Sequence, residues 1–293
     1  MLDIHIQILI GGLLTGGIYA LIALGLTLAF GVTRILNVAH GDFLMLGSLV
    51  AYWVIYFTRT NPFLMIPILL LTFFAIGVTL YLGIIRSIVK KPPETMLISS
   101  IVVTLGLAFM IEDSASYLLS TRGMNFFSIS YVLPPVEIGG IILPVTVRLI
   151  SLIVIIAGSI LLYLFIKRSL VGKMIRALIQ NREVAISLGV RDTKISAITF
   201  GISIAFAAIA GLFMLMITSL SAYSGLELTI KALTIIILGG LGSFIGALIG
   251  ALILGVTESY VGFYLGISWL PIISISVLII VLLLRPRGLF GVE

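Results

Sequence analysis

Hydrophobic residues gather in eight long segments separated by short polar stretches. The segments cover residues 6–31, 35–57, 62–85, 95–119, 141–166, 195–219, 228–260 and 267–284. Most of them match or exceed the roughly 20 residues that an α-helix needs to cross the apolar core of a bilayer. A membrane β-strand would instead alternate hydrophobic and polar residues over about ten positions. The pattern therefore predicts an all-α integral membrane protein, a polytopic bundle of eight or nine transmembrane spans.

Two of the segments do not fit a single regular crossing. In the second, Asn37, His40 and Asp42 interrupt the first third and leave a hydrophobic run too short for a full span, which predicts a broken or re-entrant helix. The seventh is too long for one crossing and contains several glycines. We expect it to form two helices joined near Gly239–Gly242, where glycine lets the backbone turn at little cost.

Positive charges indicate which loops face the cytoplasm. The stretch 167–194 holds seven Lys and Arg residues against two Asp and Glu residues, and cytoplasmic loops of membrane proteins are enriched in Lys and Arg. The loop at 86–91 and the C-terminal tail at 285–287 are also basic. Counting spans between these loops predicts an N-terminus outside and the stretch 120–140 outside. The basic tail predicts a cytoplasmic C-terminus, which requires that the seventh segment cross twice.

Composition agrees with a membrane protein and argues against several chemistries. Of the 293 residues, 61% are hydrophobic and 10% charged, whereas soluble proteins have about 25% charged residues. The formal charge of +6 is explained by basic cytoplasmic loops and does not indicate nucleic-acid binding. The chain has no Cys, only two His, and no nucleophile or phosphate-loop motif. We therefore expect no catalytic residues, no metal, no cofactor and no ATPase site of its own.

The polar loop between the fifth and sixth segments contains a helical pattern. Five polar residues recur there at spacings of three and four: Lys173, Arg176, Gln180, Glu183 and Ser187. This spacing places them on one face of a single helix. Gly189 is expected to end that helix in a left-handed conformation. The helix could rest on the lipid interface, attracted by anionic head groups, or enter the groove of a cytoplasmic partner.

The polar cluster in the second segment also has two interpretations. Asn37, His40 and Asp42, with Arg34 before them, can lie in a solvated cytoplasmic turn between the first two spans. They can instead lie at membrane depth in a discontinuous helix beside a permeation path, because ionisable residues there must face protein or water. Gly41 would permit the close backbone approach that such a site needs. The candidate substrate-pathway residues are thus Asn37, His40, Gly41 and Asp42.

Other features suggest packing and helix ends. The glycines Gly242, Gly246 and Gly250 form a GxxxGxxxG pattern, which predicts close helix packing within the chain or against a second subunit. Three carboxylates are expected to mark helix ends. They are Glu112 and Asp113 in the fourth segment and Glu258 in the seventh.

A short motif and three longer blocks resemble a known family. Glu183, Ala185 and Gly189 are similar to the E-A-A-x-x-x-G signature of permease subunits in ATP-binding cassette importers, with Val184 in place of the middle alanine. Three blocks resemble, in order, those of the branched-chain amino-acid permease family of the LivH type. They are Gly16–Gly47, Gly239–Glu258 and Leu282–Gly291.

The resemblance implies a function and a set of partners. Residues 1–293 would form one transmembrane permease domain, with 168–193 as a cytoplasmic coupling loop. The coupling residues would be Arg176, Glu183, Ala185 and Gly189. The transported species would be a branched-chain or other small apolar amino acid, carried across the cell inner membrane. The implied partners are two cytoplasmic ATP-binding subunits, a second related permease subunit or a second copy, an extracytoplasmic substrate-binding protein and the lipid bilayer.

An ion-coupled secondary transporter of a small polar solute is the alternative. Such a transporter needs intramembrane carboxylates or unwound helices for the coupling ion, and Asp42, Glu112 and Asp113 could serve. The two functions differ in what the purified chain does alone. The permease subunit would be inert without ATP-binding partners, whereas the secondary transporter would work under an ion gradient.

Overall fold

The computed structural model describes residues 2–129, 136–138, 141–143, 146–285 and 288–290, so Arg287 and parts of the stretches 120–140 and 282–291 lie outside the described residues. The longer helices are α1 (Leu2–Thr33), α2 (His40–Thr58), α3 (Met65–Leu80), α5 (Pro93–Ser120), α6 (Thr146–Arg168), α7 (Leu170–Gln180), α9 (Asp192–Ile217), α10 (Ser224–Gly239), α11 (Phe244–Tyr264) and α12 (Leu270–Leu284). The short elements are η1 (Pro62–Leu64), η2 (Tyr81–Ile85), α4 (Arg86–Val89), α8 (Arg182–Ser187), η3 (Ile267–Trp269) and the paired strands β1 (Val136–Ile138) and β2 (Ile141–Leu143).

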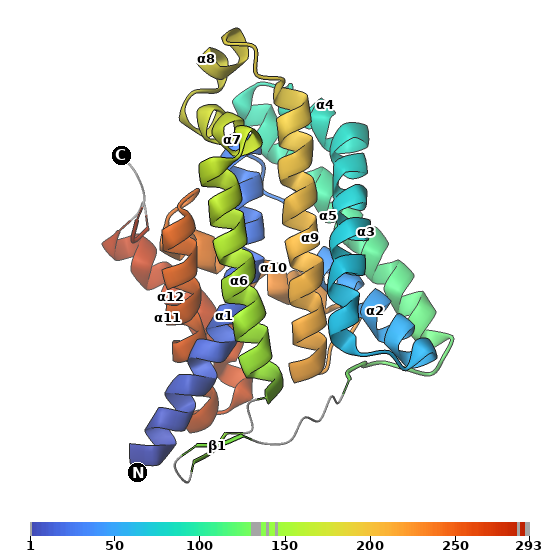
Figure 1. The fold of residues 1–293 in the computed structure, drawn as a ribbon, viewed down its shortest axis with the longest axis vertical. Coiled ribbons are helices and arrows are strands. Elements are labelled where there is room, and N and C mark those ends of the chain that lie inside the picture. Colours follow the sequence, from blue (N-terminus) through green and yellow to red (C-terminus); the bar gives the residue numbers. More distant parts are fainter. Residues whose placement is uncertain (1, 130–135, 139–140, 144–145, 286–287, 291–293) are drawn as a thin grey trace.

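The chain is an all-α membrane protein, as predicted. Within the described residues, eight helical segments are long and apolar enough to cross a membrane. One of them runs from η1 through α3 and η2 to α4 without interruption, and the others are α1, α2, α5, α6, α9, α11 and α12. Figure 1 shows them packed side by side, so that they form one helical bundle.

The predicted division of the seventh segment is confirmed. Helix α10 ends at Gly239 and α11 begins at Phe244, and Gly240 and Gly242 between them have φ values of 101° and 88°. Such positive φ values are readily adopted only by glycine. Helix α10 has only 16 residues. Between the end of α9 and the start of α11, the chain nevertheless runs from one end of the bundle to the other. Leu220 pairs with Phe127 at one end, and the α10–α11 turn lies at the other end beside α7. Among the described residues, α10 thus adds one shorter pass, between those of α9 and α11, to the eight long segments.

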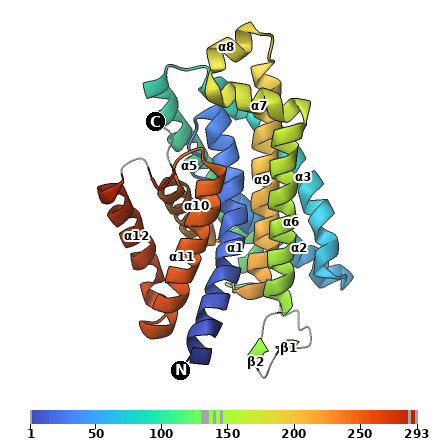
Figure 2. The ribbon, with the colours of Figure 1, turned by 60° about the vertical axis from the view of Figure 1, so that its left-hand side comes forward.

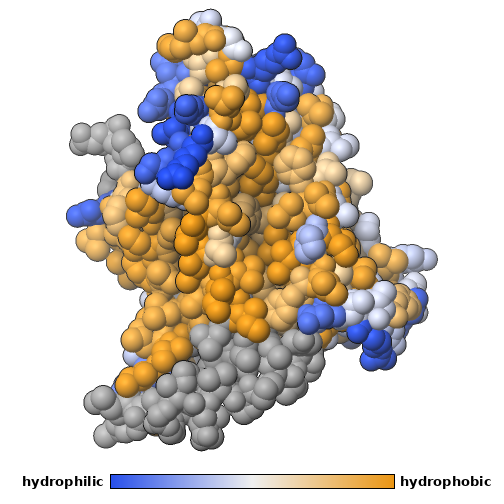
Figure 3. Space-filling view, in the orientation of Figure 1, coloured by the Kyte–Doolittle hydropathy of each residue, from blue (hydrophilic) through white to orange (hydrophobic). Residues whose placement is uncertain are grey.

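The two ends of the bundle differ in polarity. Helices α7 and α8 and the α4–α5 connection lie at one end, and hydrophilic residues gather there above a largely hydrophobic surface (Figures 1 and 3). The chain also returns to this end after α12, because the N–H of Phe290 donates to the carbonyl of Gly239 at 3.0 Å. The first turn of α1 lies at the opposite end (Figure 1).

Small residues let the central helices approach closely. A Cβ added to Gly12 would lie 2.6 Å from Cα of Val256, and one added to Gly16 would lie 2.9 Å from the carbonyl oxygen of Ala251. Helix α1 is therefore pressed against α11 at the centre of the bundle. Helix α12 lies at the outside (Figure 2) and exposes half of its hydrophobic side chains.

Candidate functional site

The second hydrophobic segment is discontinuous. Residues 34–39 are not helical, and α2 begins at His40. His40 Nε2 lies 3.1 Å from the carbonyl oxygen of Ile22. Because Ile22 is 11 residues before the end of α1 at Thr33, the linking segment runs back about 16 Å along α1. The expected break is therefore present but lies before the helix: His40 and Asp42 occupy the first turn of a continuous α2.

The cluster residues are buried at this depth. Asn37, His40 and Asp42 are at most 1% exposed, while Arg34 is exposed. Asn37, His40 and Asp42 therefore do not lie in a solvated turn, and that interpretation is wrong for them. Within the described part of the chain, the side-chain amide of Asn37 and Nδ1 of His40 have no hydrogen-bond partner. Asp42 faces the carboxyl group of Glu112 on α5. Buried polar atoms without partners cost free energy, so this cluster is a place where a polar solute or water can bind.

The first turn of α2 meets the first turn of α10. The N–H of Gly41 donates to Thr229 Oγ1 at 2.8 Å, and Thr229 Oγ1 donates to the carbonyl of Val38 at 2.8 Å. A Cβ on Gly41 would overlap the carbonyl oxygen of Gly225, and one on Gly225 would overlap the carboxyl group of Asp42. The close approach expected at Gly41 is thus present, but its partner is another helix. Two helix N-termini, each with a partial positive charge, meet inside the membrane.

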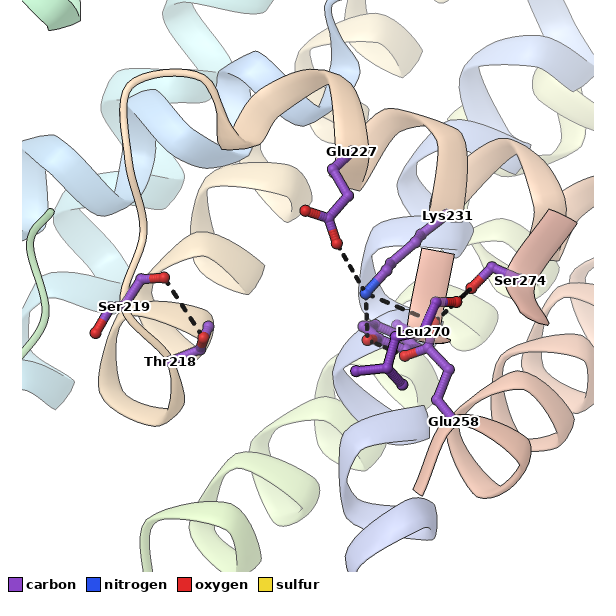
Figure 4. A network of polar contacts seen from close by, with 8 residues as sticks. Thr218, Ser219, Glu227, Lys231, Glu258, Leu270 and Ser274 are labelled. Atoms are coloured by element: carbon purple, nitrogen blue, oxygen red, sulfur yellow. Dashed lines mark hydrogen bonds and ion pairs between the residues drawn. The ribbon is translucent and has the colours of Figure 1, made fainter. Parts of the chain in front are cut away.

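A buried ionic network lies beside this contact (Figure 4). Lys231 Nζ lies 3.5 Å from Glu258 Oε1 and donates to the hydroxyl of Tyr19 at 3.2 Å. Glu258 also accepts hydrogen bonds at 2.6 Å from the hydroxyl groups of Tyr19 and Ser274. The side chains of Lys231 and Glu258 are only 9% and 5% exposed. The network joins α1, α10, α11 and α12 through their side chains.

Sequence reasoning missed this network. Glu258 was expected to mark a helix end, but it is buried and α11 continues six residues further, to Tyr264. The same expectation is wrong for Glu112, which is buried eight residues before the end of α5 at Ser120, whereas Asp113 is exposed. A signal was available, since Lys231 and Glu258 are the only charged residues in the segment 228–260 and have opposite signs.

The amphipathic helix predicted for the basic loop 167–194 consists of two helices, α7 and α8. Asn181 separates α7 from α8 with an extended backbone (φ −154°), and its side chain accepts a hydrogen bond from the N–H of Val184. Asparagine is a preferred N-cap because its side chain satisfies a free N–H of the first turn. Arg176 therefore lies on α7 and donates to the carbonyl of Lys167 at 3.3 Å, whereas Glu183 is exposed on α8. The two do not share a helix face.

Helix α8 ends as predicted. Gly189 has a φ of +89°, and its N–H donates to the carbonyl of Ile186 at 2.9 Å. The N–H of Val190 donates to the carbonyl of Ala185 at 3.0 Å. These two bonds form a Schellman motif, which uses a left-handed glycine to satisfy the last carbonyls of a helix. Ala185 is buried against the loop that this motif closes.

Three exposed hydrophobic residues lie on α8 and at its C-terminal cap. Val184 is 53% exposed, Ile186 48% and Leu188 80%. An ion pair between Arg182 Nη2 and Asp192 Oδ2 at 2.6 Å joins the start of α8 to the start of α9. A small helix that is held at its base and presents apolar side chains is suited to insertion into a groove of another protein.

The three glycines expected to pack helices divide into two groups. Gly242 lies in the α10–α11 turn, where an added Cβ would meet nothing within 4 Å among the described residues, so it packs no helix within this chain. Gly246 and Gly250 lie on α11 where it crosses α10. A Cβ on Gly250 would lie 2.9 Å from the carbonyl oxygen of Ile235, and one on Gly246 would overlap the backbone of Gly239.

Residues 8–284 match the family model described as a branched-chain amino acid transport system permease component. The chain belongs to this permease family. A family member from Pseudomonas aeruginosa, the high-affinity branched-chain amino acid transport system permease protein BraD, is 29% identical over 98% of this chain and 96% of its own length. The permease protein LivH of Escherichia coli K12 is 28% identical over 98% and 95%. A probable branched-chain amino acid transport permease protein of Methanocaldococcus jannaschii is 27% identical over 98% and 93%. The resemblance to this family is therefore confirmed.

A solved structure shares the fold of this family member. One chain of PsaBC from Streptococcus pneumoniae, solved in complex with Fab, superposes with a TM-score of 0.53 and covers 98% of this chain and 97% of its own. Its sequence is 14% identical, so the likeness concerns the fold alone. Among the described residues of the present chain, no group of three or more His, Asp or Glu side chains is placed to hold a metal ion.

Proposed function

We propose that the chain is one of two permease subunits of an ATP-binding cassette importer for branched-chain or other small apolar amino acids. Membership of the permease family supports the transport role, and the names of the relatives supply the substrate class. Two cytoplasmic ATP-binding subunits drive transport, and an extracytoplasmic binding protein delivers the amino acid. A second related permease subunit or a second copy of this chain completes the pathway. The N-terminus lies outside and the C-terminus in the cytoplasm.

The exposed apolar surface of α8 is the observation that carries this proposal. Val184 and Ile186 on α8 and Leu188 just after it are exposed, and α8 lies at one end of the bundle (Figure 1). Burial of such apolar side chains by a partner lowers the free energy of the complex. A cavity of about 420 Å³ beside α8 is lined by several cationic side chains, among them Arg86 and Lys90. We assign this end to the ATP-binding subunits. Their closure can move the permease only through contacts that differ between the open and closed states.

Asn37, His40 and Asp42 belong to the transport pathway in this proposal. They are buried beside two helix N-termini at membrane depth, the arrangement that discontinuous helices use to bind polar groups of a solute. Asp42→Asn, which keeps the size of the side chain, should lower uptake while the complex with the ATP-binding subunits still assembles. Asp113→Asn on the exposed face of α5 is the matched control and should transport as the parent does.

Reconstitution tests the function directly. The chain, its partner permease, the ATP-binding subunits and the binding protein are placed in proteoliposomes, and leucine uptake and ATP hydrolysis are measured together. We expect uptake only with all components and ATP. Uptake by the purified chain alone under a proton or sodium gradient would overturn the proposal in favour of the ion-coupled transporter.

A further inference from the structure

Glu227 is an exposed carboxylate at membrane depth. It lies in the first turn of α10, one turn before Lys231, and its side chain is 56% exposed in this chain. Lys231 contacts Tyr19, which is near the middle of the 32-residue helix α1. An ionised carboxylate at such a depth cannot face lipid tails and must instead face water or protein. The face of α10 that carries Glu227 therefore belongs to a wet path or to a contact with another subunit.

The charges of the network do not cancel. Lys231 Nζ lies 3.3 Å from Glu227 Oε1 and 3.5 Å from Glu258 Oε1, so one ammonium group faces two carboxylates (Figure 4). Glu258 has two further hydrogen-bond donors, the hydroxyl groups of Tyr19 and Ser274. Within the described part of the chain, no donor contacts the second oxygen of Glu227, Oε2. The network thus carries one surplus negative charge, and it is located at the exposed carboxylate.

Hydrophobic side chains surround this charge. Tyr223, Leu226 and Ile230 are 60%, 45% and 39% exposed, and with Glu227 they follow the spacing of one helix face. A single anionic oxygen within a small apolar surface complements a solute that has an ammonium group next to an apolar side chain. The ammonium group of such a solute would pair with the carboxylate, and its side chain would bury the exposed apolar atoms at the same time.

We propose that Glu227 binds the α-ammonium group of the transported amino acid as it passes between this chain and the second permease subunit. Lys231 holds one oxygen of Glu227, and the other accepts the ammonium group. Tyr223, Leu226 and Ile230 contact the apolar side chain of the solute. The inference rests on the proposed function, because the pathway needs a second permease subunit opposite α10.

The first test removes the charge without changing the shape. In the complete reconstituted transporter, Glu227→Gln should lower kcat/KM for leucine uptake by about tenfold to a hundredfold, the range expected for losing a hydrogen bond to a charged group. Glu227→Asp should keep part of the activity. Glu94→Gln alters an exposed carboxylate at the basic end of α5, and it should leave uptake unchanged.

The second test asks whether water reaches the position. The chain has no cysteine, so a Glu227→Cys variant has a single thiol in this subunit. A water-soluble methanethiosulfonate with a sulfonate group should restore the negative charge and raise uptake by that variant. The amino analogue should lower it further. Ile279→Cys on the outer helix α12, at a position 51% exposed, is the control and should react with neither reagent if that helix faces lipid.

Two outcomes would overturn the inference. Leucine uptake at the parent level by Glu227→Gln would show that the charge is not used. Failure of both reagents to modify Glu227→Cys would show a dry protein contact, such as an ion pair with the second subunit. If the parent transporter takes up no branched-chain amino acid, the proposed function itself fails. An active parent with an unaffected Glu227→Gln variant refutes only the role of Glu227.

Discussion

Two regions of this permease hold side chains that their surroundings normally exclude. Where α2 meets α10 at membrane depth, polar and charged residues such as Asp42 and Lys231 are buried among hydrophobic helices. At the end of the bundle that carries α7 and α8 the arrangement is reversed, because α8 exposes hydrophobic residues such as Ile186 to solvent. The first region is held by contacts between residues far apart in the chain, and the second by caps within a few residues. They should therefore respond differently to substitution.

The largest effect is expected from Lys231→Met. Removing the ammonium group leaves Glu258 buried and without its counter-ion, and breaking such a pair typically costs about 3–5 kcal/mol. We expect a large drop in the thermal unfolding temperature of the detergent-solubilised protein. The double variant Lys231→Met with Glu258→Gln should recover most of it, because no buried charge is left unpaired and the remaining carboxylate, Glu227, is 56% exposed. A double variant as unstable as the single one would contradict a charge-pairing role.

A smaller loss of stability is expected from Gly225→Val. The new side chain would overlap the carboxyl group of Asp42, and overpacking of this kind costs about 1–3 kcal/mol. Gly106→Val is the matched control, because a Cβ there meets nothing within 4 Å. The two variants are compared by thermal unfolding monitored with size-exclusion chromatography. Equal stability of both variants would show that the contact between α2 and α10 is looser than described.

Gly189→Val should affect coupling more than stability. Valine disfavours the positive φ of this position, at a cost of about 1–2 kcal/mol confined to the α8 loop. The bundle should unfold at the parent temperature, while substrate-stimulated ATP hydrolysis by the reconstituted complex is lost. Gly123 also has a positive φ, at the opposite end, so Gly123→Val serves as the control and should keep ATP hydrolysis. Normal hydrolysis by both variants would exclude α8 as the coupling element.

The smallest effect on activity is expected from two labelling variants. Ser187 on α8 and Ser128 near the other end of the bundle are both exposed, and each can be replaced by cysteine in this cysteine-free chain. Membrane-impermeant maleimides should label Ser187→Cys from the cytoplasm and Ser128→Cys from outside, with transport unchanged. The reverse labelling pattern would show that the permease has the opposite orientation in the membrane.

Features that depend on neighbouring residues could be predicted from the sequence. The turn at Gly239–Gly242 and the left-handed Gly189 follow from the conformational freedom of glycine, and both are present. The break at Asn181 was missed although it is local. The spacing of three and four between polar residues continues across Asn181, although the backbone of Asn181 is extended. The periodicity of the polar residues therefore gave no sign of the break.

Features that depend on tertiary contacts could not be predicted in the same way. Tyr19 and Lys231 are 212 positions apart, and nothing near either residue indicates the other. The burial of Asn37 and His40 also depends on the path of residues 34–39 along α1, which the sequence left open between two interpretations. The partners of each of these side chains became visible only in the fold.

The contact between Gly41 and Thr229 bears on how the chain is made. These residues are 188 positions apart, and ribosomes add about 5–20 residues per second. For roughly 10–40 seconds after the second pass has been synthesised, the backbone N–H of Gly41 has no Thr229 to bind. During that interval the nascent chain must be held by the insertion machinery or stay loosely packed. We therefore expect α2 to take its final position only when α10 emerges, so that a chain shortened before α10 is recognised by membrane proteases.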